Sequence, residues 1–151
     1  MTDFEDIYDL ALMKMKDYRL DNLAVTNYEG FLNYLRGLLV SGLGEFSGCL
    51  NDLSYTSQTE EGVTKYYFNA DLTVLEKDIL SEIIAYNWFQ QNNNDILVYK
   101  NKMTVKEFKN LEISSGLKAR VEYLDKWREK IHQKISQYQL SNFSSVFGES
   151  W

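Results

Sequence analysis

Few side chains in this 151-residue sequence could carry covalent chemistry, because it holds one histidine and one cysteine. His132 lies in the stretch "REKIHQKI", among lysine and arginine residues. A histidine that acts as a base needs a nucleophile beside it and a third group to orient it, and the local sequence supplies neither. Cys49 falls at the end of an apolar stripe, which favours a structural thiol. We therefore expect a buried Cys49, an exposed His132 and no nucleophilic catalysis.

Metal and phosphate chemistry also lack a suitable pattern. One histidine and one cysteine would need carboxylates to complete a zinc site, and no cluster has the spacing of ligands. The glycines of "SGLGEF", residues 41–46, follow a helical stripe rather than the strand that a dinucleotide loop requires, so they suit close helix approach or a helix end. The acidic stretch "DFEDIYD", residues 3–9, lacks calcium-loop spacing and suits a helix N-terminus. We predict no cofactor, no metal and no enzyme activity.

Apolar periodicity indicates the elements that would position these residues. The capping-box pattern, Ser or Thr followed three residues later by Glu or Gln, precedes four runs of apolar residues spaced by threes and fours. These runs begin at Thr2, Thr26, Thr73 and Thr104. The fourth run is the longest, and we expect a bend at 114–116 because Ser and Gly lower helix propensity.

The connections complete the expected architecture. The stretch 53–68 has β-forming residues on both sides of "EEG", which predicts either a loop or an irregular hairpin. Three asparagines at 92–94 predict a break before a short helical turn at 95–99. We predict an all-α or nearly all-α fold, in which residues 1–140 form an antiparallel bundle of about four main helices with a long C-terminal helix. Residues 141–151 are rich in Ser, Asn and Gly, and we expect them to form an extended tail.

Charge is distributed unevenly along the chain. The formal net charge is −6, yet ten of the sixteen basic residues and only five of the twenty-two acidic residues fall within 100–134. This pattern indicates a subunit with one positive and one negative side, or else an ordinary solvated helix face. The overall acidity argues against a protein that coats nucleic acid.

Length and composition favour a single intracellular domain. The first 20 residues include Asp3, Glu5, Asp6 and Asp9, where a signal peptide would need basic residues before an apolar run, and no stretch of 18 uncharged apolar residues exists. We therefore expect neither a signal peptide nor a membrane segment. A single cysteine excludes an internal disulfide and agrees with an intracellular site of assembly.

Three stretches of the sequence resemble the head–tail connector (adaptor) proteins of tailed bacteriophages, over roughly residues 28–140. They are "EFSGCLNDLSY", "YYFNADLTVLEKDILSEIIAYNWFQQ" and "EFKNLEISSGLKARVEYLDKWREKI". The positions that match the family pattern are Glu45, Phe46, Cys49, Asp52, Leu53, Phe68, Asp71, Leu72, Glu76, Ile79, Leu80, Asn87, Trp88, Glu107, Phe108 and Lys109. The sequence departs from the family at Ser115 and Gly116, where Ala or His is usual, and at Phe89 and Gln90, where the family often has "WL.P".

The resemblance implies a structural protein of the virion neck, assembled in the host cytoplasm. Family members form a ring, typically of twelve subunits, beneath the portal protein, and this ring extends the DNA ejection channel and carries the stopper or tail-completion protein. In such a ring each subunit uses one face for one neighbour and a different face for the next. These heterologous interfaces agree with a subunit that has one positive and one negative side. Because the subunit is acidic, we expect double-stranded DNA to pass through without specific binding.

Two groups of residues are candidates for binding in this scheme. Lys126, Arg128 and Lys130 on the basic segment, together with Trp88 from the strongly apolar stretch 78–91, are predicted subunit-interface residues. Four large apolar residues of the expected tail are predicted portal-binding anchors, unless the tail folds back on its own bundle. These anchors are Phe143, Val146, Phe147 and Trp151.

Two other classes of function compete with the connector. A small helical regulator would bind a single host or phage protein as a monomer or dimer. A minor enzyme or nuclease subunit would need catalytic groups that the sequence lacks.

Overall fold

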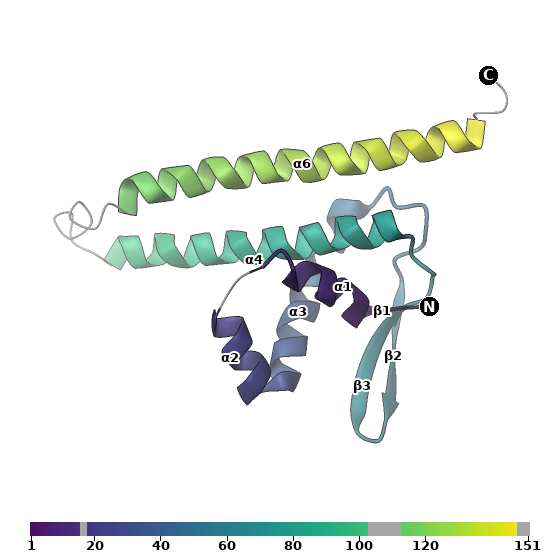
Figure 1. Ribbon diagram of the computed structural model, residues 1–151, viewed down its shortest axis with the longest axis horizontal. Helices are drawn as coiled ribbons and strands as arrows, with labels where there is room; N and C mark the ends of the chain where they lie inside the picture. The colour runs from purple at the N-terminus through teal and green to yellow at the C-terminus, as the bar shows by residue number, and fades with distance from the viewer. Residues whose placement is uncertain (16–17, 103–112, 148–151) are drawn as a thin grey trace.

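Helices make up most of the computed structural model, which describes residues 1–15, 18–102 and 113–147, with side chains described over 1–15, 20–92 and 118–142 (Figure 1). The helices are α1 (Phe4–Leu12), α2 (Tyr18–Thr26), α3 (Tyr28–Gly42), the 3-10 helix η1 (Leu43–Phe46), α4 (Val74–Lys102) and α6 (Ile113–Phe147). The strands β1 (Thr2–Asp3), β2 (Tyr55–Glu60) and β3 (Val63–Phe68) form one antiparallel sheet in the order β1-β3-β2. The strictly all-α expectation is therefore wrong, whereas the hairpin alternative for 53–68 is confirmed.

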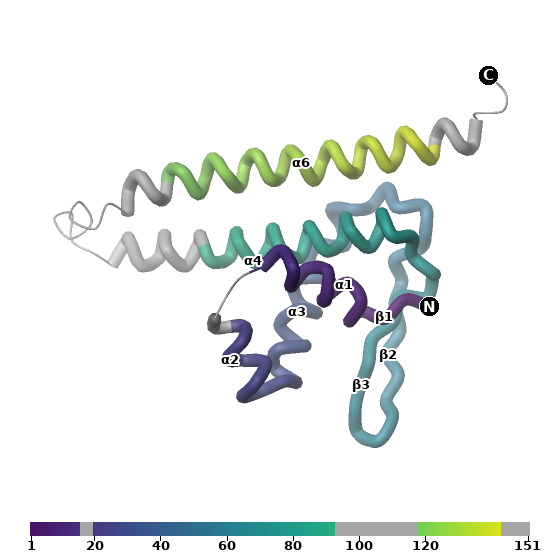
Figure 2. The backbone as a smooth tube through the Cα atoms, viewed as in Figure 1, coloured from purple at the N-terminus to yellow at the C-terminus, as the bar shows by residue number. Residues whose placement is uncertain are grey.

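Helix α4 lies at the centre of the molecule and packs against α1, α3 and α6. Its most buried side chains include Ile79, Leu80, Ile83 and Ile84, which belong to the hydrophobic core cluster of the described residues. Helix α6 runs beside α4 in the opposite direction (Figures 1 and 2). The apolar stretch 78–91 thus buries most of its surface within its own chain.

The capping box predicted at the start of α4 is confirmed. The Thr73 backbone N–H donates to Glu76 Oε1 at 2.8 Å, and the Glu76 N–H donates to Thr73 Oγ1 at 3.2 Å. This reciprocal pair satisfies two backbone donors that a helix start leaves without partners. The fourth predicted box, at Thr104, lies outside the described residues.

The first two predicted helix starts are displaced by one residue each. Thr2 lies in β1, where its Oγ1 donates to the Ala70 carbonyl and accepts from the Leu72 N–H, both at 2.9 Å. The cap of α1 is instead Asp3, and that of α3 is Asn27 rather than Thr26. Short polar side chains compete for such positions, and Asp and Asn are at least as good as Thr.

The two long helices extend further than the sequence indicated. Helix α4 continues through 92–94, so the expected break and separate turn at 95–99 are wrong. Helix α6 continues to Phe147, so the extended tail is wrong over 141–147. Each Asn or Ser costs a helix only a fraction of a kcal/mol, and extending an existing helix avoids the cost of nucleation. Residues 114–116 lie near the start of α6 and not at its middle.

Gly42 permits the close contact between α3 and α4. A Cβ atom at this position would lie 2.3 Å from Ile83 Cγ2, closer than packed atoms allow. The interpretation of the "SGLGEF" glycines as residues of helix approach is confirmed for Gly42. Gly44, by contrast, has open space around it.

The outer part of the β2–β3 hairpin, residues 57–65, is exposed on both strands, and we call it the hairpin arm. It projects away from the helices (Figure 1). At its base, the Phe4 ring contacts the rings of Phe68, Tyr55 and Tyr66 at 4.5, 5.4 and 5.9 Å. At its tip, Glu61 has a φ of 51°, a left-handed conformation that costs a non-glycine residue about 1 kcal/mol.

Candidate functional site

The Glu76 carboxylate joins three separate parts of the chain, and we call this cluster the Glu76 joint. Its Oε2 accepts from the Tyr138 hydroxyl at 2.7 Å and from the Cys49 thiol at 2.9 Å. Its Oε1 accepts from Asn51 Nδ2 at 2.7 Å and from the Thr73 backbone N–H at 2.8 Å. The carboxylate thus accepts from donors in three places: the residue before α4, the loop after η1, and α6.

This coordination controls the pKa values in the joint. Burial alone would raise the pKa of Glu76, but the four hydrogen bonds favour the carboxylate and hold its pKa at about 2. Burial and the bond to Glu76 raise the pKa of Cys49 to about 12. Burial also raises the pKa of Tyr138 above its ordinary value. A protonated thiol and phenol around an ionised carboxylate form a structural site, because no group there is ready to give or take a proton near neutral pH.

A second set of charges links the turn after α1 to α4 and α6. Lys14 Nζ lies 2.8 Å from Asp78 Oδ1 and 3.2 Å from Glu82 Oε1, and Lys134 Nζ lies 2.9 Å from Asp78 Oδ2 and 3.2 Å from the same Glu82 oxygen. The other Glu82 oxygen accepts from Trp127 Nε1 at 2.8 Å. Two lysines and two carboxylates therefore neutralise each other, in what we call the Lys14–Lys134 network.

Beside this network lies a groove of about 480 Å³, which we call the basic aromatic groove. It is lined by Lys14, Glu82, Tyr123, Lys126, Trp127, Lys130, Ile131 and Lys134. Neither Lys126 nor Lys130 forms an ion pair with any residue that the structure describes. The groove therefore presents two unneutralised ammonium groups next to aromatic surface.

Two aromatic rings line this groove, Tyr123 and Trp127, and they belong to a connected set of rings that extends beyond it to Phe89 and Tyr86. Trp127 lies 5.7 Å from Tyr123, 5.9 Å from Phe89 and 6.0 Å from Tyr86, measured between ring centroids. Most of these pairs are edge-to-face, which is a favourable arrangement of ring quadrupoles. The Tyr123 side chain remains 55% exposed. In the groove, the Tyr123 and Trp127 rings thus give a partner apolar surface next to the Lys126 and Lys130 ammonium groups.

Arg128 lies on a different side of α6. It lines a small pocket of about 110 Å³ together with Tyr86, Asn87, Glu45 and His132. His132 is exposed, as predicted, and its Nε2 lies 3.7 Å from Glu45 Oε2. The structure thus brings Lys126 and Lys130 together in one groove and separates Arg128 from them.

Trp88 lies within the chain's own core, where only 9% of it is exposed. Its ring centroid is 6.2 Å from that of Phe89 in an edge-to-face contact. An interface role for Trp88 stays a prediction, with little exposed ring to support it.

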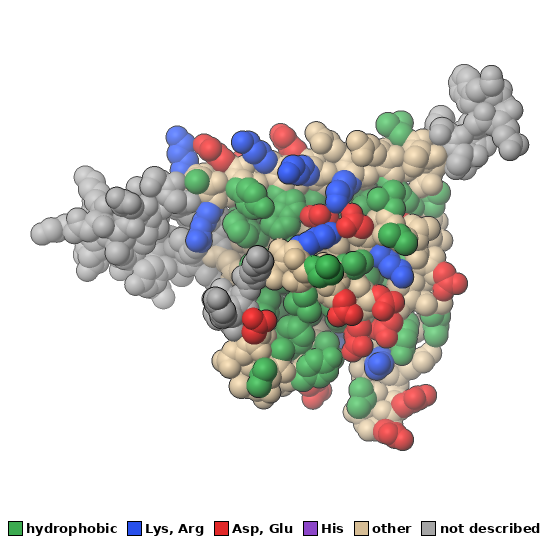
Figure 3. Space-filling view, in the orientation of Figure 1, with side chains coloured by type: hydrophobic (Ala, Val, Ile, Leu, Met, Phe, Trp, Pro, Cys, Tyr) green, Lys and Arg blue, Asp and Glu red, His purple; other side chains and the backbone are tan. Residues whose placement is uncertain are grey.

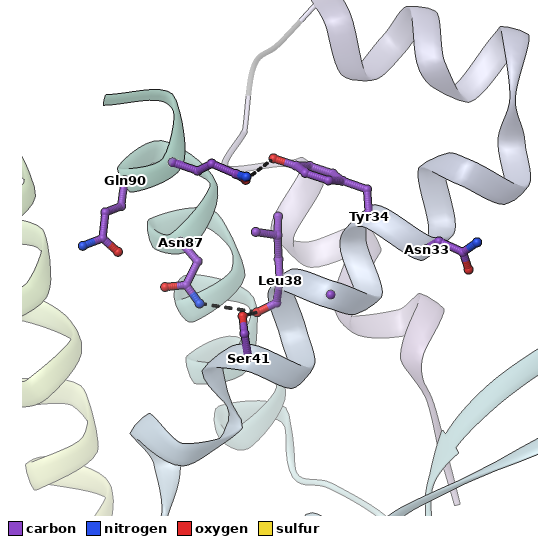
Figure 4. Close-up of a pocket in the computed structure, with 8 residues that line it drawn as sticks. Asn33, Tyr34, Leu38, Ser41, Asn87 and Gln90 are labelled. Atoms are coloured by element: carbon purple, nitrogen blue, oxygen red, sulfur yellow. Dashed lines mark hydrogen bonds between the residues drawn. The ribbon is translucent and has the colours of Figure 1, made fainter. Parts of the chain in front are cut away.

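A third groove, of about 640 Å³, lies between α3 and α4, and its lining combines polar side chains with Gly37 and Leu38 (Figure 4). The Tyr34 hydroxyl donates to Gln91 Oε1 at 2.9 Å across it, and Asn87 Nδ2 donates to the Leu38 carbonyl at 3.4 Å. Amides and hydroxyls line this groove without a carboxylate, an imidazole or an ammonium group. It offers hydrogen bonds to a partner but no acid or base.

The side chains of the predicted portal anchors lie outside the part of the chain whose side chains the structure describes. Phe143, Val146 and Phe147 lie in the last turns of α6, beyond the described side chains, and Trp151 lies outside the described residues. Their role as docking anchors stays a prediction.

Charge is unevenly distributed over the described surface. Lysine and arginine side chains follow α6, which also carries the exposed Glu122, Asp125 and Glu129. Aspartate and glutamate side chains gather over α1 and at the tip of the hairpin arm (Figure 3). Within the described part of the chain, no three His, Cys, Asp or Glu side chains gather as metal ligands would, and no helix combines the length and apolarity needed to cross a membrane.

The sequence reasoning missed the aromatic half of the basic groove and the tip of the hairpin arm. A signal for the groove was present, because Tyr123, Trp127 and Ile131 are spaced by four and share a helix face with Lys126 and Lys130. No comparable signal identified Lys14, which reaches the groove from the turn that follows α1.

The fold and the site together define a mostly helical protein with a small antiparallel sheet, whose best candidate site is a binding surface. Comparisons with known protein families, with curated proteins and with solved structures found no match.

Proposed function

We propose that this protein is a head–tail connector (adaptor) of a tailed bacteriophage, a structural and non-enzymatic component of the virion neck. The observation that carries this proposal is the Glu76 joint. Cys49 comes from the first stretch that resembles the family and Glu76 from the second, and the two meet at 2.9 Å. The matching residues Phe46, Phe68 and Ile79 are fully buried in the same core. These positions of the resemblance thus lie together in one core of this chain, which supports the proposal.

The charge distribution supports a ring. A ring subunit uses one face for one neighbour and a different face for the next, and opposite charges on these faces favour that order of assembly. We infer that copies of this chain associate head to tail, typically twelve to a ring, beneath the portal protein. In this arrangement α1, α3, α4 and α6 act as the helical bundle expected from the sequence, with α4 at its centre.

Electron microscopy of the purified protein, alone and mixed with the portal protein from the genome that encodes it, tests the proposal. We expect a ring bound to the portal, or a free ring of high order. A particle no larger than a dimer, with no association with the portal, would contradict the connector and favour the small helical regulator.

The C-terminal residues are proposed to dock on the portal protein. Deleting residues 141–151 should abolish attachment to the portal while the melting temperature of the free protein stays unchanged, because Tyr138 and the rest of the core are retained. A truncated protein that melts several degrees lower would instead indicate that these residues pack on their own chain.

DNA is proposed to pass through the ring without being held. Many copies of an acidic subunit give a channel that repels phosphate, whereas a basic lining would bind duplex DNA with a steep dependence on salt. Submicromolar, salt-sensitive binding of the free protein to random duplex DNA would contradict this part of the proposal. On the tail side of the ring, the stopper or tail-completion protein is the proposed partner.

A further inference from the structure

The hairpin arm is more exposed than its own fold requires. Both strands are exposed over residues 57–65, and β3 meets β1 only at Tyr67 and Phe68. A two-stranded hairpin without a supporting layer is marginally stable in water. The arm is therefore an element whose outer half has no packing partner among the described residues.

The tip of the arm carries two carboxylates that the fold does not use. Glu60 and Glu61 are exposed and form no ion pair with the described residues. Glu61 also occupies a left-handed position, with a φ of 51°, before Gly62. A two-residue turn of this kind favours Asn at such a position, so the carboxylate is not the residue that best stabilises the turn. Backbone strain of this sort is more often retained where a side chain is needed for a contact.

The basic aromatic groove presents the complementary set of groups. Lys14 and Lys134 are already neutralised by Asp78 and Glu82. Of the four lysines that line the groove, Lys126 and Lys130 form no ion pair with a described residue, and they lie next to the Trp127 and Tyr123 rings. Two free ammonium groups in the groove thus match two free carboxylates on the arm.

A single copy cannot join these two surfaces. The arm projects from the side of the molecule opposite to α6, which carries the groove (Figure 1). The arm and the groove can meet only between different copies, and each copy then offers one of each. A contact of this kind is heterologous and can close into a ring.

We propose that the tip of the hairpin arm of one copy docks in the basic aromatic groove of the next. Glu60 and Glu61 pair with Lys126 and Lys130, and Val63, which is 57% exposed, packs on the rings of the groove. The proposal rests on the ring of the proposed function and specifies which two surfaces form its subunit contact.

Charge reversal on both sides gives the sharpest test. The variants Glu60→Lys/Glu61→Lys and Lys126→Glu/Lys130→Glu should each assemble at least ten-fold more weakly than the wild type. The measured quantity is the protein concentration at which half of the chains are in oligomers, determined by native mass spectrometry. Mixing the two variants in equal amounts should restore assembly, because each arm then meets a groove of opposite charge in an alternating ring. The matched control Lys118→Glu/Arg120→Glu changes the charge of α6 equally, outside the groove, and should assemble to within two-fold of the wild type.

A single substitution separates the contact from the fold. Glu61→Asn suits the turn better, so it should leave the melting temperature unchanged or higher, yet weaken assembly several-fold by removing one carboxylate. A Glu61→Asn variant that assembles as well as the wild type would count against the contact.

The outcomes distinguish this contact from the ring itself. The proposed contact is overturned, and the ring stands, if the wild type and both reversed variants assemble equally well. The same conclusion follows if the mixture of the two variants fails to assemble although circular dichroism shows that each is folded. If the wild type stays monomeric at every concentration and does not bind the portal, both proposals are overturned.

Discussion

The Glu76 joint and the basic aromatic groove both contain charged residues of α4 and α6. They differ in whether those charged groups have partners within the chain. In the joint, one buried carboxylate accepts four hydrogen bonds, and its residue is only 1% exposed. In the groove, Lys126 and Lys130 are exposed and have no ion pair among the described residues. A charge with all its partners inside the chain stabilises the fold, whereas a charge without them is available to another molecule. The comparison predicts that substitutions in the joint change stability and that substitutions in the groove change assembly.

Removing the acceptor from the joint should have the largest effect on stability. Glu76→Ala leaves four donors from three parts of the chain without their partner, and we expect a loss of roughly 3–5 kcal/mol in the free energy of unfolding. Urea denaturation followed by circular dichroism measures it. Glu76→Gln, which keeps one acceptor oxygen, should lose less, and a loss below about 1 kcal/mol for the Ala variant would show that the joint does not stabilise the fold.

The joint should also make stability depend on acid pH. The pKa of Glu76 is about 2 in the folded chain, below its ordinary value of 4.5. The carboxylate therefore stabilises the fold fully above pH 4.5, and this contribution, roughly 2–3 kcal/mol, is lost as the pH falls towards 2. Unfolding free energies measured from pH 6 to pH 2 should fall less steeply for Glu76→Gln than for the wild type. Equal slopes for the two proteins would contradict the assignment.

Two tyrosines on α6 allow the same substitution to be made in both regions. The Tyr138 hydroxyl donates to Glu76 and accepts from the Leu50 backbone N–H at 3.0 Å, so Tyr138→Phe should cost roughly 1–3 kcal/mol. The Tyr123 side chain is half exposed in the groove, so Tyr123→Phe should change stability by less than about 0.5 kcal/mol. Similar losses in thermal denaturation would remove the contrast between the two regions.

The lysines of the groove should have the smallest effect on stability. Lys126→Glu/Lys130→Glu should change the unfolding free energy by less than about 1 kcal/mol and leave the helical circular dichroism spectrum intact. Reversing Arg128 as well should add little to the loss of assembly, because Arg128 lines a different pocket from the two lysines. Assembly that depends on Arg128 alone would move the interface to the other side of α6.

The features of this structure that could be predicted from the sequence depend on residues that are close together in the chain. The capping box joins Thr73 and Glu76, three residues apart, and was predicted. The bond from Tyr138 to Glu76 joins residues 62 apart, which no local pattern indicates. The strand β1 has two residues and therefore no periodicity to detect. The separation of Arg128 from Lys126 and Lys130 follows from helix geometry, since residues four apart share a face and residues two apart do not.

The mass distribution of the protein as a function of salt tests the central claim most directly, namely that the charges unpaired within one copy are the ones that join copies. Mass photometry at about 50 and 500 mM salt should show closed particles of one high mass that diminish as salt rises, because exposed ion pairs are screened. The Lys126→Glu/Lys130→Glu variant should remain monomeric at both salt concentrations while melting within a few degrees of the wild type. Particles of the same mass and the same salt response in this variant would contradict the account.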